Sequence, residues 1–286
     1  MHIVVLVKQV PETSAVRLDD TTGTMIREGV ESIVNPLDLY AVEAALCLRD
    51  IACPEVRITA LSMGPPKAEV ALREVMSMGV DEAVLLTDRA FAGADTWSTS
   101  MVLAAAVRHV SPCDLILCGE RATDGDTGQV GPGVAAFLDL PVVSYVTSMC
   151  LVHAGVCRAV RLVEGGRHHV EVDLPAVVTV VKEIGVPRLP TLQGKRRARG
   201  ARVRHLSCAD LELKADHVGL RGSPTRVERI FRPRVSRNGR IHLASTPAEM
   251  GPALDALMCL LSERNLPAPS PATSPKTGLP GLERRT

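Results

Sequence analysis

Four short apolar runs, each followed by a turn and a stretch with helical spacing, constrain the fold of this chain most strongly. The runs are His2–Val7, Val56–Leu61, Ala83–Leu86 and Leu115–Cys118. Three of them are dominated by Val, Ile and Leu without polar alternation, which is typical of parallel strands buried on both faces, whereas Arg57 and Thr59 interrupt Val56–Leu61. The stretches that follow them predict helices over 36–46, 67–78, 97–110 and 134–138. Strands alternating with helices predict an α/β fold with a doubly wound, mainly parallel sheet.

The segment Gly119–Pro132, which follows the fourth run, is rich in Gly, Asp and Thr. These residues suit tight turns and helix N-caps, and the unpaired N–H groups at a helix start attract phosphate. The turns 62–66 and 87–97 follow the second and third runs, while Lys8 ends the first run and Asn35 precedes the first helix. Because the carboxyl ends of parallel strands share one edge, we expect these segments to converge. Convergence favours a nucleotide site over the alternative, an ordinary capped strand–helix loop.

From Pro141 onward the pattern changes. Val142–Val146 predicts one more strand. A half-exposed antiparallel hairpin is predicted from Arg158–Val163, His168–Leu174 and Ala176–Val181. His168 and His169 are adjacent and point to opposite faces of a strand, so they make a poor joint metal site.

The remaining third predicts an arm that needs a partner. Lys195–Arg204 carries six positive charges and no acidic one. Without nearby aromatic residues this favours a solvated helix face or a docking segment for an acidic partner over a nucleic-acid patch. Pro247–Glu263 has helical spacing, and the Pro, Ser, Thr and Gly after it predict disorder. The predicted domains are therefore a nucleotide- or flavin-binding domain over 1–185, an arm over 186–265 and a disordered tail over 266–286.

Composition argues against several classes of partner. The formal net charge is +1, from 33 basic and 32 acidic side chains, so a polyanionic partner such as nucleic acid is not expected. An aromatic content of 2% leaves few rings for stacking on single strands. No apolar run reaches the roughly 18 residues of a membrane helix, and Met1–Lys8 lacks the features of a signal peptide. The eight cysteines include no C-x-x-C pair and most lie in apolar runs, so we expect buried free thiols, no metal site and a cytoplasmic location.

Several segments together resemble the β subunit of electron transfer flavoproteins, in order from residue 1 to about 235. They are Val7–Pro11, Asn35–Asp38 with Ala41–Glu43, Ser62–Pro65, Ala90–Thr96, Asp124–Thr127 with Gln129–Pro132, and Leu220–Thr225. The resemblance implies an adenine-nucleotide-binding α/β domain and a C-terminal arm that embraces an α subunit, which holds an electron-carrying FAD.

Two branches of this family differ in the cofactor of the β subunit. In one branch it is a structural AMP. In the other, which includes nitrogen-fixation-associated proteins, it is a second FAD that accepts hydride from NADH. That FAD splits the two electrons between the α-subunit FAD and a ferredoxin or flavodoxin. The chain resembles the second branch in Gly125–Thr127, Ala90–Thr96 and Gly222–Thr225.

By the same resemblance, the cofactor-binding residues can be named. The ADP half of FAD is expected among Leu6, Lys8, Asn35, Asp38, Ser62, Asp124, Thr127, Gln129 and Val130. The isoalloxazine is expected near Asp95, Thr96 and Thr99, with NADH approaching over 62–66 and 90–96. Further cofactor-binding candidates are Met63, Gly64, Gly119, Ala122, Thr123, Gly125, Asp126 and Gly128. No catalytic acid or base is implied, because the flavin carries the redox chemistry.

Leu192 aligns with the leucine through which this family docks acyl-CoA dehydrogenases; the alternative is a plain interface leucine. The resemblance implies an acyl-CoA dehydrogenase or a quinone oxidoreductase as redox partner. Three departures bear on bifurcation: Gly128 replaces a usual alanine, Trp97-Ser98 replaces a Leu-Ala pair, and Arg121 replaces a glutamine. Two alternatives stay open, an AMP-bearing subunit that does not bifurcate and a nucleotide-binding sensor without a redox role. The long arm counts against the sensor.

Overall fold

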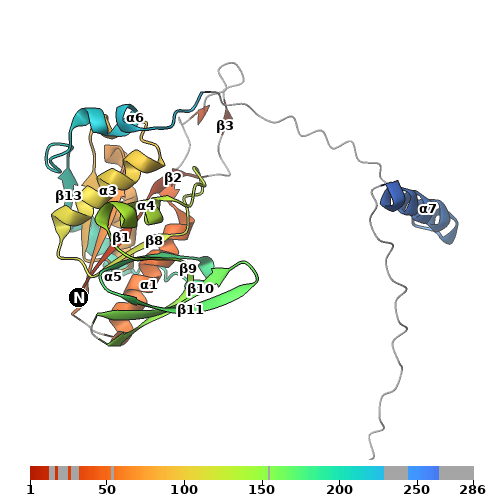
Figure 1. Cartoon of the computed structure of the whole chain (residues 1–286), viewed down its shortest axis with the longest axis horizontal. Helices are drawn as coiled ribbons and strands as arrows, with labels where there is room; N and C mark the ends of the chain where they lie inside the picture. The colour runs from red at the N-terminus through yellow and green to blue at the C-terminus, as the bar shows by residue number, and fades with distance from the viewer. Residues whose placement is uncertain are drawn as a thin grey trace, which may run out of the picture. The chain divides into compact units, whose positions relative to one another are not determined.

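The computed structural model describes residues 1–12, 17–18, 25–26, 32–52, 55–153, 155–228 and 244–263. The chain divides into two compact units, Met1–Phe231 and Arg232–Thr286 (Figure 1). The first unit therefore continues well past residue 185, where the sequence places the domain boundary. The predicted tail over 266–286 lies outside the described residues.

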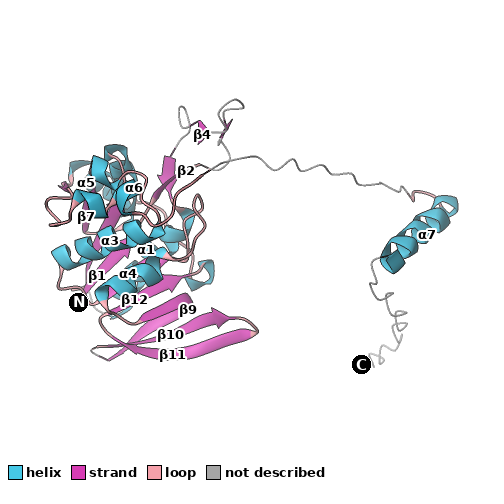
Figure 2. Cartoon of the chain, turned by 45° about the horizontal axis from the view of Figure 1, so that its top comes forward, coloured by secondary structure: helices cyan, strands magenta, loops and turns pink. Residues whose placement is uncertain are grey.

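The first unit is built on one large sheet (Figure 2). Within the described chain its strand order is β11 (Gly166–Asp173), β10 (Val156–Val163), β9 (Val142–His153), β12 (Ala176–Val180), β8 (Leu115–Gly119), β1 (His2–Leu6), β6 (Arg57–Met63), β7 (Glu82–Leu86) and β13 (Val203–Leu206). All neighbours from β9 to β13 pair in parallel, whereas β9, β10 and β11 pair antiparallel. The predicted α/β class, with its mainly parallel sheet and antiparallel hairpin, is confirmed.

Short antiparallel pairs connect the first strand to the first helix. β2 (Gln9–Pro11) pairs with β5 (Ser32–Val34), and β3 (Arg17–Leu18) pairs with β4 (Met25–Ile26). The sequence predicts a hairpin or excursion over 17–31, which agrees with the second pair. Because β2 and β5 pair, the residues before and after this excursion lie close to each other.

Helices cover both faces of the sheet. The described helices of the first unit are α1 (Pro36–Ala52), α2 (Glu69–Met78), α3 (Thr96–Val110), α4 (Val130–Leu138), α5 (Leu192–Gly200) and α6 (Gly219–Gly222). The second unit, described by itself, contains α7 (Pro247–Glu263). Short 3-10 turns are η2 (Pro66–Ala68), η3 (Arg89–Phe91), η4 (Lys182–Ile184) and η5 (Ala215–His217).

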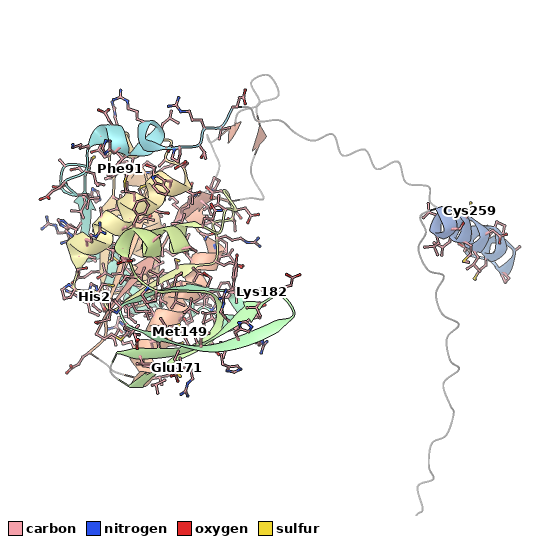
Figure 3. The ribbon with its side chains drawn as sticks, viewed as in Figure 1. His2, Phe91, Met149, Glu171, Lys182 and Cys259 are labelled. Atoms are coloured by element: carbon pink, nitrogen blue, oxygen red, sulfur yellow. The ribbon has the colours of Figure 1, made fainter. Side chains whose placement is uncertain are left out.

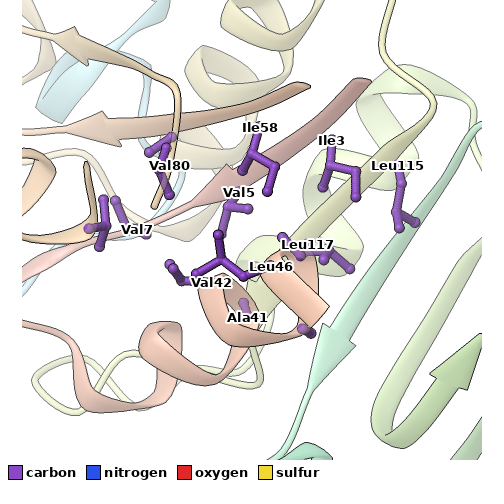
Figure 4. Packing of buried hydrophobic residues seen from close by; sticks show 14 of the residues in the cluster. Ile3, Val5, Val7, Ala41, Val42, Leu46, Ile58, Val80, Leu115 and Leu117 are labelled. Carbon is purple, nitrogen blue, oxygen red and sulfur yellow. The ribbon is translucent and has the colours of Figure 1, made fainter. Parts of the chain in front are cut away.

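Alternate residues of β1 belong to two different hydrophobic clusters, one on each face of the sheet. Ile3 and Val5 pack with α1 and α2, as Figure 4 shows around Val42 and Leu46. Val4 and Leu6 pack on the opposite face with α3 and α4, in a cluster that also holds Phe91, labelled in Figure 3. Side chains of a strand alternate between faces, so a continuous apolar run is what a sheet covered on both sides requires.

Two segments lie elsewhere than the sequence predicts. Ala176–Val180 is not part of the hairpin but a fully buried central strand, β12, parallel to β8 and β9. Its unbroken apolar character is that of a strand buried on both faces. Val203–Leu206, predicted within the arm, forms β13 and extends the sheet next to β7.

Two arginine side chains hold the basic helix α5 against α2. Arg73 donates to the carbonyl of Ala198 at 2.6 Å, and Arg197 donates to the carbonyl of Met76 at 3.0 Å. Each arginine thus satisfies carbonyls near the end of the other helix, where no intrahelical donor is available. Gly194 lies so close to the Ser77 carbonyl that no side chain fits between them. Part of the basic segment is therefore structural.

In the second unit, α7 has the bounds that the sequence predicts. Its side chains Leu254, Leu257 and Leu260 are about half exposed. None of the helices in the described ranges is both long enough and apolar enough to cross a bilayer.

Candidate functional site

Polar residues from three elements meet at the carboxyl end of β1 and β8. The backbone N–H of Lys8 donates to Asp38 Oδ2 at 2.8 Å, and Lys8 Nζ pairs with Asp124 Oδ1 at 2.7 Å. Asn35, fully buried, donates through Nδ2 to the Arg121 carbonyl at 2.9 Å and accepts from the Thr123 N–H at 3.2 Å. Asn35 thus fixes the loop after β8 against the start of α1.

Asp38 is a buried carboxyl group at this edge, 6% exposed. Burial raises its pKa to about 7, even though hydrogen bonds from Asn35 and from the backbone N–H groups of Lys8 and Gly119 act to lower it. The protonation of this residue therefore changes near neutral pH, beside the Lys8–Asp124 ion pair.

This raised pKa gives a testable pH dependence. Between the ordinary value of 3.8 and about 7, the folded state keeps a proton that the unfolded state has lost. Proton linkage then lowers the free energy of unfolding as pH rises, by about 2 to 3 kcal/mol between pH 5 and pH 7.5. We expect Asp38→Asn to flatten the pH profile by that amount in urea titrations. The exposed Asp173→Asn should keep the wild-type slope, and equal slopes for all three proteins would contradict the assignment.

The loop from Glu120 to Gln129 presents backbone donors rather than free charge. Its carboxylates are paired, Asp124 with Lys8 and Asp126 with Arg121 at 3.1 Å. Gly128 has φ 63°, the left-handed conformation that favours glycine, which accounts for glycine at this position. α4 then begins with no side-chain cap. As in any α-helix, its first N–H groups, on Val130 and Gly131, have no carbonyl partner within the helix, and they are therefore candidate donors to an anion.

The turn after β6 ends on the same edge. Ser62 is fully buried, and its Oγ has no hydrogen-bond partner among the described residues. The N–H of Gly64 donates to the Leu86 carbonyl at 3.0 Å, which ties this turn to β7. Met63 between them is half-buried.

Asp95 forms a clasp between α3 and the segment after α6. Its carboxylate caps α3 by accepting from Ser98 N–H at 3.0 Å, and it accepts from Thr225 N–H at 2.9 Å and Thr225 Oγ1 at 2.7 Å. The Asp95 N–H donates to Ser223 Oγ at 2.8 Å. Burial acts to raise the pKa of Asp95, but these hydrogen bonds outweigh it and lower the pKa. The carboxylate thus binds protein groups, and its role at the site is to hold the start of α3 and the segment around Thr225 together.

A pocket of about 590 Å³ opens between α3 and α4. Thr127 and Gln129 of the loop, Thr96 and Trp97 of α3, Phe137 of α4, and Pro224 and Thr225 beyond α6 line it. Trp97 and Phe137 meet edge to face, with ring centroids 4.9 Å apart. Thr127 and Gln129 of the pocket also belong to the loop that leads into α4. The N–H groups at the start of α4, which suit an anion, therefore lie close to a cavity lined by aromatic rings.

The structure brings most predicted site residues into two connected groups. The edge group consists of Lys8, Asn35, Asp38, Gly119, Thr123 and Asp124, whereas Asp95, Thr96, Thr127 and Gln129 contribute to the pocket group. Ala122 accepts from the Asp126 N–H at 2.8 Å within the loop. Thr99 lies one turn along α3 and donates its N–H to the Asp95 carbonyl. Leu6 is buried in the core beneath the edge.

Sequence reasoning missed several site residues. Phe137 and Ser100 line the pocket, and only their helical spacing from the loop and from Thr96 marks them. Tyr145 has φ 61°, a rare conformation for a bulky residue, and a methyl group added at Gly128 would lie 3.6 Å from its hydroxyl. Nothing in the sequence near Tyr145 indicates this backbone. Thr225 could have been predicted from the sequence, because it lies in Gly222–Thr225, which matches a segment of the family that the chain resembles.

Comparisons with known proteins bear on the family of this chain. The family model described as electron transfer flavoprotein domain matches residues 22–211. The electron transfer flavoprotein subunit beta of Thermoanaerobacterium thermosaccharolyticum is 46% identical over 242 residues, which are 84% of this chain and 92% of that protein. The chain belongs to the electron transfer flavoprotein family. The resemblance found in the sequence is thereby confirmed.

Other members of the electron transfer flavoprotein family match over similar lengths. Subunit CarD of the caffeyl-CoA reductase–Etf complex of Acetobacterium woodii is 43% identical over 260 residues, 89% of this chain and 96% of that protein. Protein FixA of Bradyrhizobium diazoefficiens is 40% identical over 258 residues, 87% of this chain and 89% of that protein. The chain is similar to β subunits in particular, so its clasp and pocket can be considered as parts of such a subunit.

Proposed function

We propose that this chain is the β subunit of a heterodimeric electron transfer flavoprotein and that it binds FAD along the path from the edge group to the pocket. The observation that carries the proposal is the continuity between the start of α4 and the pocket, because Gln129, which immediately precedes α4, also lines the pocket, as does Thr127 of the same loop. AMP would use only the edge group and the loop. A ring-sized pocket beyond the phosphate donors favours the larger cofactor.

Each part of the path has a role set by its chemistry. Val130 and Gly131 offer N–H groups to the phosphates at the positive end of the α4 dipole. Asn35 and Lys8 order the loop through Arg121, Thr123 and Asp124, so the donors are in place before the ligand arrives. The clasp at Asp95 holds the far wall of the pocket.

A bound flavin would supply the redox chemistry, taking up and releasing electrons without help from a protein acid or base. The chain orients the cofactor, excludes water through the apolar pocket wall, and surrounds it with fixed dipoles. We propose NADH, approaching over 62–66 and 90–96, or a dehydrogenase as the electron donor. The α-subunit FAD would be the acceptor, with ferredoxin or flavodoxin as a second acceptor if the electrons bifurcate.

An exposed apolar segment supports docking of a redox partner, for which we propose an acyl-CoA dehydrogenase or a quinone oxidoreductase. Leu189 and Leu192 are 85% and 77% exposed. Arg188 holds this segment against α1 by pairing with Glu43 Oε2 and Asp50 Oδ2, each at 2.9 Å. Ordering such leucines by an ion pair lowers the entropy lost when a partner binds them. For 186–265, docking on the α subunit remains a proposal.

One measurement tests the proposed function. The chain is purified together with its α subunit, and FAD and AMP are counted per heterodimer after denaturation. We expect two FAD and no AMP. One FAD and one AMP would instead assign the chain to the AMP-bearing, non-bifurcating form. A complex without flavin, or a chain that binds no α subunit, would overturn the redox function and favour a nucleotide sensor.

A further inference from the structure

Aromatic side chains are scarce in this chain, yet two of them share one pocket. The sequence has one Trp, two Tyr and three Phe. Trp97 and Phe137 both line the pocket between α3 and α4. Trp97 is 57% exposed although it is the largest apolar side chain of the protein. A ring that contacts Phe137 only edge to face, with an interplanar angle of 68°, keeps much of its surface accessible from the pocket.

The walls around Trp97 are fixed before any ligand binds. Trp97 is the second residue of α3, whose first turn is capped by Asp95. The same carboxylate holds Thr225 at 2.7 Å, and Pro224 beside it lines the pocket as well. Ser100 Oγ donates to the Thr96 carbonyl at 2.7 Å, so its proton is already used within α3. A mainly apolar wall that holds two aromatic rings suits a flat ring system better than a phosphate.

From these contacts we propose that Trp97 is a ligand-positioning residue, which stacks on the planar ring system at the far end of the cofactor from its adenosine. This inference rests on the proposed function, because the phosphates at α4 place that ring system next to Thr127 and Gln129. Phe137 supports the indole from the side, and Pro224 with Thr225 bounds the other end of the pocket. AMP, which lacks the second ring system, should not reach Trp97.

Trp97 is the only tryptophan of the chain, so its fluorescence reports on the pocket directly. The full chain is titrated with FAD and with AMP while tryptophan emission and binding by equilibrium dialysis are followed. We expect FAD to quench most of the emission and AMP to leave it nearly unchanged. In Trp97→Leu, FAD affinity should fall about tenfold, the effect of losing one stacking side chain, while AMP affinity stays within about twofold.

Trp97→Phe keeps an aromatic face and should retain FAD affinity within about threefold. This variant also tests the role of the ring if Trp97→Leu folds poorly. Unquenched emission in FAD-saturated wild type, or wild-type FAD affinity in Trp97→Leu, would overturn the role of Trp97 and leave the proposed function intact. If wild type binds neither FAD nor AMP, alone or with the α subunit, the proposed function itself is overturned together with this inference.

Discussion

Gln129→Glu is expected to weaken FAD or AMP binding at least tenfold while making the fold slightly more stable than wild type. Gln129 precedes the first turn of α4 and also lines the pocket. A carboxylate there repels the phosphates that we place at this helix start; at about 5 Å and an effective dielectric constant near 20, the repulsion is about 3 kcal/mol. The same negative charge interacts favourably with the helix dipole, by up to about 1 kcal/mol. Affinity and stability should therefore change in opposite directions.

Gln193→Glu is the matched control for that variant. It makes the same isosteric change in the first turn of another helix, α5, at an exposed position. It should alter neither affinity, measured by equilibrium dialysis, nor the urea midpoint by more than a small amount. Wild-type nucleotide affinity in Gln129→Glu would show that the phosphates bind elsewhere.

Among the glycines of the predicted site, adding a methyl group should be most destabilising at Gly119. We expect Gly119→Ala to lower the free energy of unfolding by about 3 kcal/mol. A Cβ at this position would lie 2.6 Å from Asp38 Oδ1 and 2.7 Å from the carbonyl oxygen of Leu37. The second of these is backbone, so α1 would have to move away from β8. That movement would also break the hydrogen bond from the Gly119 N–H to Asp38.

Gly125→Ala is the control for this steric prediction. Gly125 belongs to the same loop, but an added methyl group there has no heavy atom within 4 Å. Its unfolding free energy should stay within about 0.5 kcal/mol of wild type, as for ordinary surface changes. Urea unfolding of both variants decides the point, and equal midpoints for them would contradict the close approach of α1 and β8.

The cysteines illustrate how far composition can predict surroundings. Their occurrence in apolar runs predicts buried thiols, and Cys118, Cys157 and Cys208 are indeed buried and free. Cys150 is exposed, because it lies on a strand of the antiparallel part, where one face of the sheet is open. Cys53 lies outside the described residues.

Local sequence pattern alone determined the strands β1, β6, β7 and β8, the helices α1 to α4 and α7, and the edge where the candidate site lies. Val- and Ile-rich runs, the Asn35-Pro36 start of α1 and the spacing in 247–263 specify their structures through interactions between near neighbours in the chain. For the same reason the loops after β1, β6 and β8 were predictable as site residues, since parallel strands place their ends together.

Only the tertiary structure decided how distant segments meet. The position of β12 between β8 and β9, the addition of β13 and the clasp between Asp95 and Thr225 join residues far apart in sequence. The same holds for the pKa of Asp38, which depends on its burial and on hydrogen bonds from the N–H groups of Lys8 and Gly119, residues far from it in the chain. Packing selects among many pairings that the local pattern allows equally. The pocket beside Trp97 exists only because that selection brings α3, α4 and Thr225 together.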